Sequence, residues 1–287
     1  MVFHQQQFAA AFTSTALFKA LPPLPEVKIF ETLPSTNQTL WQLLDQGATT
    51  EIVIAEQQTA GRGQWGRQWQ SSLGGLYLSA AFFPNIPAAN STPLTLCSAW
   101  GIATALRVYG IPAFLKWPND LLLDGRKLGG ILTETRIASG QITKAVIGIG
   151  INWDNSVPET GITLKSWMEL NSLSGERDEE TKRKNFPSLH LPLSPSPPIT
   201  SLETLAAITL QGLLFGYQRW SEAGIEALLP SYLELLSHQG CPVVVNGQSG
   251  VVVGVTSTGE LQVRLNSATT PSEICLKPGT ISLGYGR

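Results

Sequence analysis

The spacing of apolar residues changes once along this 287-residue chain, near Cys241. Before that point, stretches with helical spacing alternate with short β-branched runs, a pattern typical of a mixed α/β domain. After it the period is two, in short runs punctuated by Asn246-Gly247 and Thr258-Gly259. We therefore predict a mixed β-sheet packed with helices, followed by a small SH3-like β-barrel.

The expected elements follow from local periodicity and capping residues. Strands are predicted at residues 27–30, 52–55, 76–83, 113–117, 121–123, 128–133 and 145–151, and in the small domain at 243–245, 251–255, 261–265 and 274–276. Helices are predicted after residues 34–37, at 93–108, from the capping box at 200–203 to about 220, and at 222–236. Asp124-Gly125 predicts a tight hairpin.

The chain is expected to comprise an N-terminal extension at 1–26, a large domain at 27–238 and the small β domain at 239–287. Residues 1–25 lack arginine and end in prolines, which favours a frayed amphipathic terminus over a secretory signal. Residues 171–200 join a block of alternating charge to five prolines, a composition that cannot bury a core. This segment is therefore predicted to be a flexible insertion.

Composition excludes several classes of protein. The chain is 43% hydrophobic and 14% charged, with 19 basic and 21 acidic residues, so it is not expected to be disordered. A net charge of −2 argues against a nucleic-acid partner, and no apolar run is long enough to span a bilayer. Cys97, Cys241 and Cys275 are far apart and odd in number, which favours a reducing compartment such as the cytoplasm.

The segment Gly61-Arg62-Gly63-Gln64-Trp65-Gly66-Arg67 combines three glycines with two arginines. Glycines let backbone amides approach an anion, and arginines supply planar charged donors, so the loop suits a polyphosphate or an acyl phosphate. Its spacing matches neither the P-loop nor the dinucleotide fingerprint. A solvated loop with ordinary arginines is the alternative reading.

Three other segments could contribute to the same site. Lys127, beside the string Lys116-Trp117-Pro118-Asn119-Asp120, could approach a phosphate, or could simply pair with Asp120 across a hairpin. Two glycines in Gly148-Ile149-Gly150-Ile151-Asn152 mark a close approach to a strand, by a ligand or by a packed helix. Ser35-Thr36-Asn37 could cap a helix without binding anything, and capping is the expected role of at least one of them.

Taken together, in this order and spacing, these motifs and Lys127-Leu128-Gly129-Gly130-Ile131-Leu132 closely resemble the biotin protein ligases. The resemblance runs from about Pro34 to the C-terminus and breaks at the insertion. It implies a catalytic domain at 27–238 related to the class II synthetase and lipoate ligase folds. It also implies a two-step reaction, in which biotin and ATP form biotinyl-5′-AMP with Mg²⁺, and the biotinyl group then passes to a lysine of a carboxylase's biotin carboxyl carrier domain.

The resemblance also assigns roles to individual residues. Biotin would be bound by Ser35, Thr36, Asn37, Gln58, Gly61, Arg62, Gly63, Lys127, Gly130 and Gly150. ATP or the adenylate would be bound by Arg62, Gln64, Arg67, Lys116, Asn119, Asp120, Lys127 and Asn152. Arg62 and Lys127 would be catalytic. Asp120 is the candidate metal ligand, although the sequence leaves metal binding and orientation of the substrate both open.

The chain departs from the family pattern in two places. Many members carry a second arginine where this chain has Gln64, which keeps hydrogen-bonding capacity but loses the charge. Only about 30 residues precede Pro34, too few for the winged helix-turn-helix domain of bifunctional members, so a monofunctional enzyme is expected, as a monomer or homodimer. The alternatives are a lipoate ligase, whose loop lacks this arginine pattern, and a biotin-sensing DNA-binding regulator.

Overall fold

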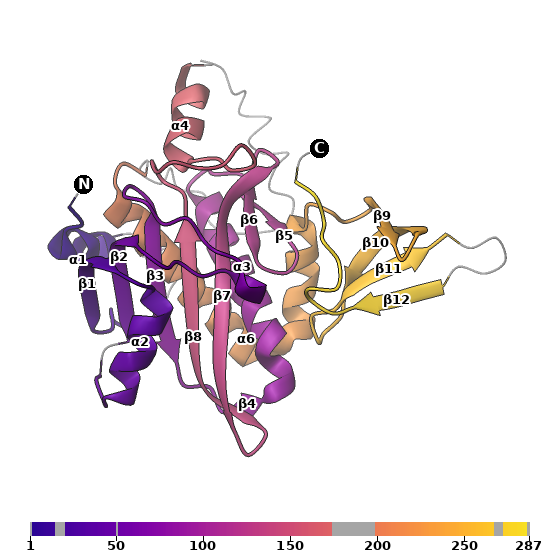
Figure 1. Ribbon diagram of the computed structural model, residues 1–287, viewed down its shortest axis with the longest axis horizontal. Coiled ribbons are helices and arrows are strands. Elements are labelled where there is room, and N and C mark those ends of the chain that lie inside the picture. The colour runs from indigo at the N-terminus through magenta and orange to yellow at the C-terminus, as the bar shows by residue number, and fades with distance from the viewer. Residues whose placement is uncertain (1, 15–20, 50, 174–198, 267–271, 286–287) are drawn as a thin grey trace.

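The computed structural model describes residues 2–14, 21–49, 51–173, 199–266 and 272–285, and an eight-stranded sheet forms its centre (Figure 1). The strand order is β1-β2-β3-β8-β7-β6-β5, with β4 paired to β8. The strands are β1 (Val27–Leu33), β2 (Ile52–Gln58), β3 (Leu76–Phe82), β4 (Ile86–Pro87), β5 (Phe114–Lys116), β6 (Asp120–Leu123), β7 (Arg126–Ala138) and β8 (Gln141–Ile151). β1 and β2 are parallel, and the neighbours β3, β8 and β7 are antiparallel, so the predicted mixed α/β fold is confirmed.

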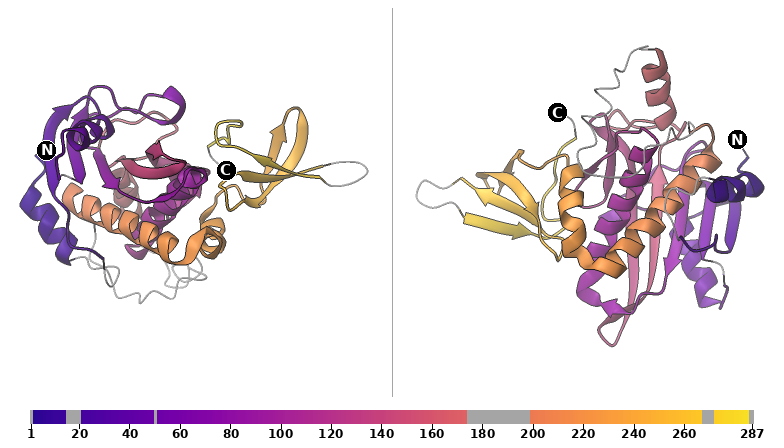
Figure 2. Two further views of the ribbon diagram at one scale, coloured as in Figure 1. Left: turned by 90° about the horizontal axis from the view of Figure 1, so that it is seen from below. Right: turned by 180° about the vertical axis from the view of Figure 1, so that it is seen from behind.

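Helices cover both faces of this sheet, because alternate residues of its strands are apolar on each side. Ile52 and Ile54 of β2 face the core formed with α3 (Ser91–Val108) and α6 (Leu202–Leu235), whose ribbons cross in front of the sheet in the right panel of Figure 2. Val53 lies in the separate cluster under α2 (Thr36–Asp45). None of the described helices combines the length and apolarity needed to cross a lipid bilayer.

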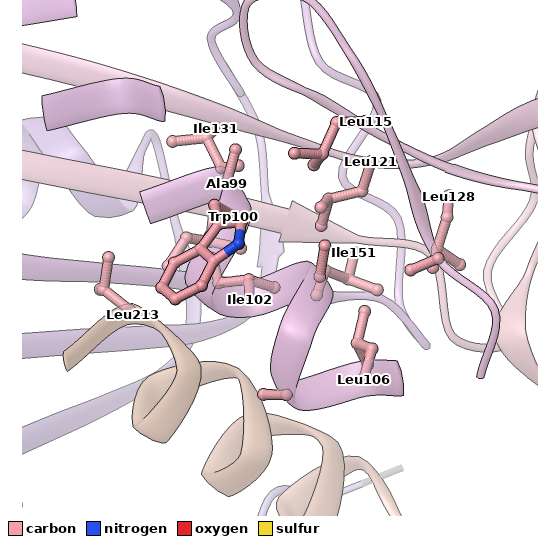
Figure 3. Close-up of a cluster of buried hydrophobic side chains, with 14 of the residues drawn as sticks. Ala99, Trp100, Ile102, Leu106, Leu115, Leu121, Leu128, Ile131, Ile151 and Leu213 are labelled. Atoms are coloured by element: carbon pink, nitrogen blue, oxygen red, sulfur yellow. The ribbon is translucent and has the colours of Figure 1, made fainter. Parts of the chain in front are cut away.

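The core behind β7 and β8 is closely packed (Figure 3). Trp100 of α3 and Leu213 of α6 lie beside Ile131 of β7 in this cluster, and all three are buried. A Cβ at Gly101 would overlap the backbone of α6, so the glycine lets the two helices cross at close range. This packing holds β7 and β8 in place, and the face of these strands that points away from α3 and α6 carries the candidate site.

Residues 2–14 are packed against the large domain, which corrects the prediction of a frayed terminus for this part of the chain. Residues Gln5–Ser14 form α1, and Phe8 and Phe12 are buried against α6 and the sheet. The backbone N–H of Phe3 donates to Glu56 Oε1 at 2.8 Å, and that of His4 donates to Glu203 Oε1 at 3.0 Å. Carboxylates from distant elements therefore satisfy backbone donors at the start of α1, and apolar burial holds it in place.

Replacing Phe8 by alanine should lower the free energy of unfolding by about 3–5 kcal/mol, because it empties a fully buried site in α1. Urea unfolding measures the change. Gln6→Ala on the exposed face of α1 is the matched control and should alter stability by no more than about 0.5 kcal/mol. Equal stabilities for the two variants would show that α1 does not contribute to the folded core.

Two further predictions are corrected at their edges. The insertion was expected to begin at residue 171, but α4 (Leu164–Leu173) continues through its first three residues, and residues 174–198 lie outside those described. The two helices expected between 200 and 236 are confirmed within α6, where Gly224, with φ of 76°, is not helical and divides the element in two. The cap lies one residue later than the capping box at 200–203 predicts: Ser201 accepts a hydrogen bond from the Thr204 N–H, and Glu203 accepts from His4 instead of closing the box.

A four-stranded antiparallel sheet forms the small C-terminal unit, in the order β12-β11-β10-β9. Its strands are β9 (Pro242–Val245), β10 (Gln248–Val255), β11 (Leu261–Leu265) and β12 (Ser272–Leu276). It lies beside the second half of α6 in Figure 1, and the chain after β12 returns toward the large sheet. Trp117 Nε1 donates to the Gly259 carbonyl at 2.9 Å, which ties the two units together beside the predicted site.

Candidate active site

A cavity of about 300 Å³ collects most of the residues selected from the sequence. It lies on the sheet face opposite α3 and is bordered by the β2–β3 loop, which contains the short 3₁₀ turn η1 (Gln64–Gly66). A second 3₁₀ turn, η2 (Ala88–Asn90), precedes α3. The predicted residues that line the cavity are Ser35, Thr36, Asn37, Gln58, Arg62, Gly63, Gln64, Arg67, Lys116, Asn119, Asp120, Lys127, Gly130 and Gly150. Gly61 and Asn152 lie outside its lining.

One end of the cavity is polar and uncharged. Gln58 Oε1 accepts from the Thr36 N–H at 2.8 Å, and Gln58 Nε2 donates to Ser71 Oγ at 2.7 Å. Ser79 Oγ lies 2.8 Å from Thr36 Oγ1 and 2.6 Å from Asn37 Oδ1. Because these groups are buried and bonded to one another, their lone pairs and protons are fixed in direction.

Ser35 lies at the N-cap position of α2, as its sequence context predicts, but its side chain makes no capping hydrogen bond. Thr36 and Asn37 already belong to the helix, and their side chains turn to Ser79 and Gln58. The capping role expected for this segment is therefore wrong for its side chains. Their burial at the cavity is explained better by a ligand-binding role.

The middle of the cavity is a slot in which two strands present glycine. A Cβ at Gly148 of β8 would overlap Asn37 Oδ1, and one at Gly150 would lie 2.5 Å from Trp69 Nε1. A Cβ at Gly130 would make ordinary contact with Lys127 Cε at 3.5 Å. The first two glycines therefore make room for side chains that form the cavity wall.

The other end is basic. Among the described residues lining the cavity, Arg62, Arg67, Lys116 and Lys127 are basic and Asp120 is acidic. Lys127 Nζ is 2.7 Å from Asp120 Oδ1, which confirms the cross-hairpin ion pair. The pair is 25% and 11% exposed at its two side chains, so water screens it less than a surface pair. An excess of cations in a partly buried cavity favours a ligand with more than one negative charge.

Arg62 does not extend freely into the cavity. Its guanidinium forms an ion pair with Glu134 of β7, whose other oxygen accepts from Asn37 Nδ2 at 2.9 Å. Glu134 thus joins the basic loop to the polar end, a contact that the sequence interpretation missed. The sequence feature that could have revealed it is the period-two alternation along β7, which places Gly130, Leu132 and Glu134 on one face of the strand.

Three predicted residues are engaged with the backbone. Asn119 Nδ2 donates to the Ile131 carbonyl at 3.0 Å, and Asn152 Nδ2 donates to the Lys127 carbonyl at 3.2 Å. Gly61 packs under the loop, where a Cβ would overlap Ser71 and the Trp69 carbonyl. These residues shape the loop and the strand that carry the charged groups.

A second cavity of about 260 Å³ shares Trp69 and Lys127 with the first. Asn152 lines it, together with residues between Ser156 and Gly161 that follow β8. Lys127 is anchored between the two cavities, because its N–H donates to the Thr160 carbonyl at 2.9 Å and its carbonyl accepts from the Ile162 N–H at 3.0 Å. The arrangement can hold a two-part ligand whose charged centre lies at Lys127.

A model of the biotin/lipoate A/B protein ligase family matches residues 29–152. The Biotin--[acetyl-CoA-carboxylase] ligase of Paracoccus denitrificans is 30% identical over 161 residues, which cover 55% of this chain and 67% of that protein. Bifunctional ligase/repressor BirA of Bacillus subtilis is 38% identical over 151 residues, which cover 51% of this chain and 46% of that protein.

The chain spans about half the length of the bifunctional relatives that it matches. The solved structure of biotin protein ligase from Aquifex aeolicus in complex with biotin and ATP aligns with a TM-score of 0.59 at 23% identity, covering 92% of this chain and 100% of that one. At this identity the alignment shows a shared fold, that of a mixed α/β ligase domain with a small β unit. The similarity to the Paracoccus relative, together with the match to the family model, shows that the chain belongs to the biotin/lipoate A/B protein ligase family.

Proposed function

We propose that this chain is an ATP-dependent ligase that activates biotin as biotinyl-5′-AMP and transfers the biotinyl group to a lysine of a biotin carboxyl carrier domain. The single observation that supports it best is the gradient along the first cavity. The uncharged side chains of Thr36 and Asn37, the glycines of β8 and β7, and the cations Lys116 and Lys127 follow one another, in the order of the ureido ring, the tail and the carboxylate of biotin. Arg62 lies beside the uncharged end, where it is paired with Glu134.

The polar end suits a ureido group, which offers two N–H donors and one carbonyl acceptor. Asn37 and Thr36 combine donors and acceptors there, and Ser35 adds a hydroxyl without a capping bond. Gln58 fixes Thr36 by accepting from its N–H. An acid without the ureido ring would leave the buried polar groups of this end without hydrogen-bond partners. This end would therefore select biotin over such acids.

The basic end suits the first chemical step, in which one anion attacks another. A carboxylate oxygen of biotin bonds to the α-phosphorus of ATP, and the bond from that phosphorus to the pyrophosphate oxygen breaks. Arg62, Lys116 and Lys127 would lower the repulsion between the anions and stabilise the charge that develops on the phosphoryl oxygens. We assign the nucleotide to the second cavity, next to Trp69 and Asn152.

The second step is attack of a carrier lysine amine on the biotinyl carbonyl. The new C–N bond forms, the bond to the AMP oxygen breaks, and the amine loses a proton. The adenylate would hydrolyse in open water, so the β2–β3 loop over the cavity would protect it. Its turn at Gly66, with φ of 72°, uses a conformation that favours glycine.

The residues do not fit a metal site built by the protein alone. The described residues contain no group of three or more His, Cys, Asp or Glu side chains that could hold a metal ion. Both oxygens of Asp120 already have partners, Lys127 Nζ at 2.7 Å and Tyr285 Oη at 2.6 Å. We therefore propose that Mg²⁺ enters bound to the ATP phosphates, and we assign it no protein ligand.

The acceptor follows from the relatives. The Paracoccus relative is named for acetyl-CoA carboxylase, so we propose the biotin carrier domain of that enzyme as the acceptor. Cys97, Cys241 and Cys275 form no disulfide with one another, which supports a reducing compartment, and we propose the cytoplasm. The proposed reaction involves neither a nucleic acid nor a membrane. A monomer and a homodimer are both compatible with it.

Biotin-dependent exchange of pyrophosphate into ATP tests the first step, with lipoate and octanoate as competing acids. We expect exchange with biotin only. Transfer of biotin to a carrier-domain lysine, with ATP and Mg²⁺ present and then each omitted, tests the whole reaction. Exchange with lipoate in place of biotin would establish a lipoate ligase instead, and exchange with none of the three acids would overturn the proposal.

Replacing Gly148 by alanine should raise the KM for biotin about 10-fold or more, since overpacking a fixed site typically costs 1–3 kcal/mol. The new Cβ would overlap Asn37 Oδ1, which Ser79 and Glu134 hold in place. Steady-state exchange kinetics measure the change. Thr143→Ala, exposed on the same strand, is the control and should leave the KM unchanged. An unchanged KM in the Gly148 variant would place biotin elsewhere.

Lys116 should give ATP binding a dependence on pH. Burial lowers the pKa of Lys116 to about 8. The negative charge of Asp120 raises this pKa, whereas the positive charges of Lys127 and Arg67 lower it further. The ammonium is therefore largely charged at pH 7 and loses its proton as the pH rises through about 8. We expect the KM for ATP to rise up to about 10-fold between pH 7 and pH 9, in step with the loss of charge.

The matched variant is Lys116→Arg, whose guanidinium stays charged over this range, so its KM for ATP should not rise with pH. Each variant is compared with itself at the two pH values, because arginine can alter the KM at any single pH. The same rise in both proteins would assign the titration to another group.

A further inference from the structure

The chain after β12 returns to the large domain, as the yellow trace in Figure 1 shows. We call residues 277–285 the C-terminal strap. Gly279 lies under Trp65 of the β2–β3 loop, where a Cβ would be 2.7 Å from Trp65 Nε1. Leu283 is buried, and residues 279–283 line the first cavity. The strap is therefore part of the cavity wall.

The strap places Tyr285 against two charged residues of the site. Tyr285 Oη donates a hydrogen bond to Asp120 Oδ2 at 2.6 Å. Lys116 Nζ lies 3.3 Å from the centre of the Tyr285 ring, close enough for a cation–π interaction. The hydroxyl and the ring thus contact different groups, on β6 and β5.

The Tyr285 hydroxyl bond continues to Lys127. Asp120 Oδ1 is the partner of Lys127 Nζ at 2.7 Å, so the two oxygens of one buried carboxylate join the tyrosine to the lysine. Burial raises the pKa of Tyr285, and the charge of Asp120 raises it further. The hydroxyl therefore keeps its proton and acts as the donor in this bond.

We infer that Tyr285 is a positioning residue of the ligase, a role that rests on the proposed function. Its hydroxyl fixes the rotation of Asp120 and thereby the point from which Lys127 reaches the reacting phosphate. Its ring holds the ammonium of Lys116 over the same end of the cavity. Lysine has a long, flexible stem, so a fixed partner is needed to keep its charge in one place.

Two substitutions separate the contributions of the hydroxyl and the ring. Tyr285→Phe keeps the ring beside Lys116 and leaves one oxygen of Asp120 without its donor. It should lower kcat for biotin-dependent pyrophosphate exchange about 10-fold, with the KM for ATP within about twofold of the unchanged chain. Tyr285→Leu removes the ring as well, and should also raise the KM for ATP about fivefold or more.

A C-terminal strap that only stabilises the fold would lower the Tm when Tyr285 is replaced. Both variants should unfold at the Tm of the unchanged chain if positioning is the role. Tyr217→Phe, a partly buried tyrosine on α6 outside the site, is the matched control and should change neither kcat nor KM. Adding Tyr285→Phe to Asp120→Asn should cause no further loss of kcat, because the hydroxyl acts through that carboxylate.

Calorimetric titration of the full chain with ATP, without biotin, provides a readout independent of turnover. Weaker binding to Tyr285→Leu than to Tyr285→Phe would support the inference. It is overturned if the unchanged chain is active but Tyr285→Phe has the same kcat, if the effects of Tyr285→Phe and Asp120→Asn add, or if Tyr285→Leu binds ATP normally. A chain that neither binds ATP nor exchanges pyrophosphate with biotin would instead overturn the proposed function, and this inference with it.

Discussion

We expect Arg62→Ala to lower the rate of adenylate formation by about 10²-fold or more, because the role proposed for this cation is to stabilise charge that develops in the transition state. The fold should be unaffected. The Arg62 side chain is 44% exposed, and its ion pair with Glu134 links two elements that are also held by other contacts. Biotin-dependent pyrophosphate exchange measures the rate, and thermal unfolding checks the fold.

The variant should also release biotinyl-AMP into solution, since the loop loses one of its contacts with the anion. Chromatography of a reaction without a carrier domain detects the released compound. Arg136→Ala is the matched control, because Arg136 forms a comparably exposed ion pair with Asp45 away from the cavity. Normal adenylation without release in the Arg62 variant would reject its assignment.

Glu134 explains why Arg62 need not face the substrate at all times. The guanidinium is paired with this carboxylate, which also accepts a hydrogen bond from Asn37. A bound carboxylate or phosphate would compete with Glu134 for the same guanidinium.

Much of the site was predictable because its residues belong to short motifs attached to recognisable elements. The hairpin at Asp124-Gly125 has positive φ at both residues, 52° and 69°, as a tight turn of this composition requires. It brings Lys127 back beside Asp120, so their pairing could be anticipated from local sequence. The glycines of β8 also marked a close approach, because a Cβ at Gly148 would overlap Asn37 of α2 and one at Gly150 would overlap Trp69.

Other features depend on contacts between residues far apart in the sequence. Tyr285 reaches Asp120 from the C-terminal strap, and no local pattern distinguishes such a tyrosine from a surface residue. Nothing in the sequence around Ser79 distinguishes it from an ordinary strand residue, because its contact with Asn37 forms only in the folded sheet. For α1 the signal was present in the spacing of Phe8 and Phe12, but the partners that bury them come from α6 and the sheet.

Lys127 should tolerate no substitution, not even by arginine. Its ammonium is held by Asp120 at 2.7 Å and lies 5.2 Å from the centre of the Trp69 ring, while its backbone is bonded on both sides to residues 160 and 162. A planar guanidinium in that space would engage Asp120 with two donors and would not reproduce a compact charge between two anions. We expect Lys127→Arg to lower adenylation about 10²-fold, and Lys127→Ala to lower it further.

Preformed biotinyl-AMP separates the two steps. If Lys127 acts mainly in adenylation, both variants should recover much of their transfer to a carrier domain when they are supplied with the adenylate. Lys165→Arg is the control, because Lys165 forms a surface pair with Asp154 at 2.6 Å and should be unaffected in either assay. If transfer from the adenylate stays as slow as the overall reaction, Lys127 also serves the second step. Its charge would then stabilise the departing AMP phosphate as well as the attacked one, and the division of roles between Arg62 and Lys127 would have to be redrawn.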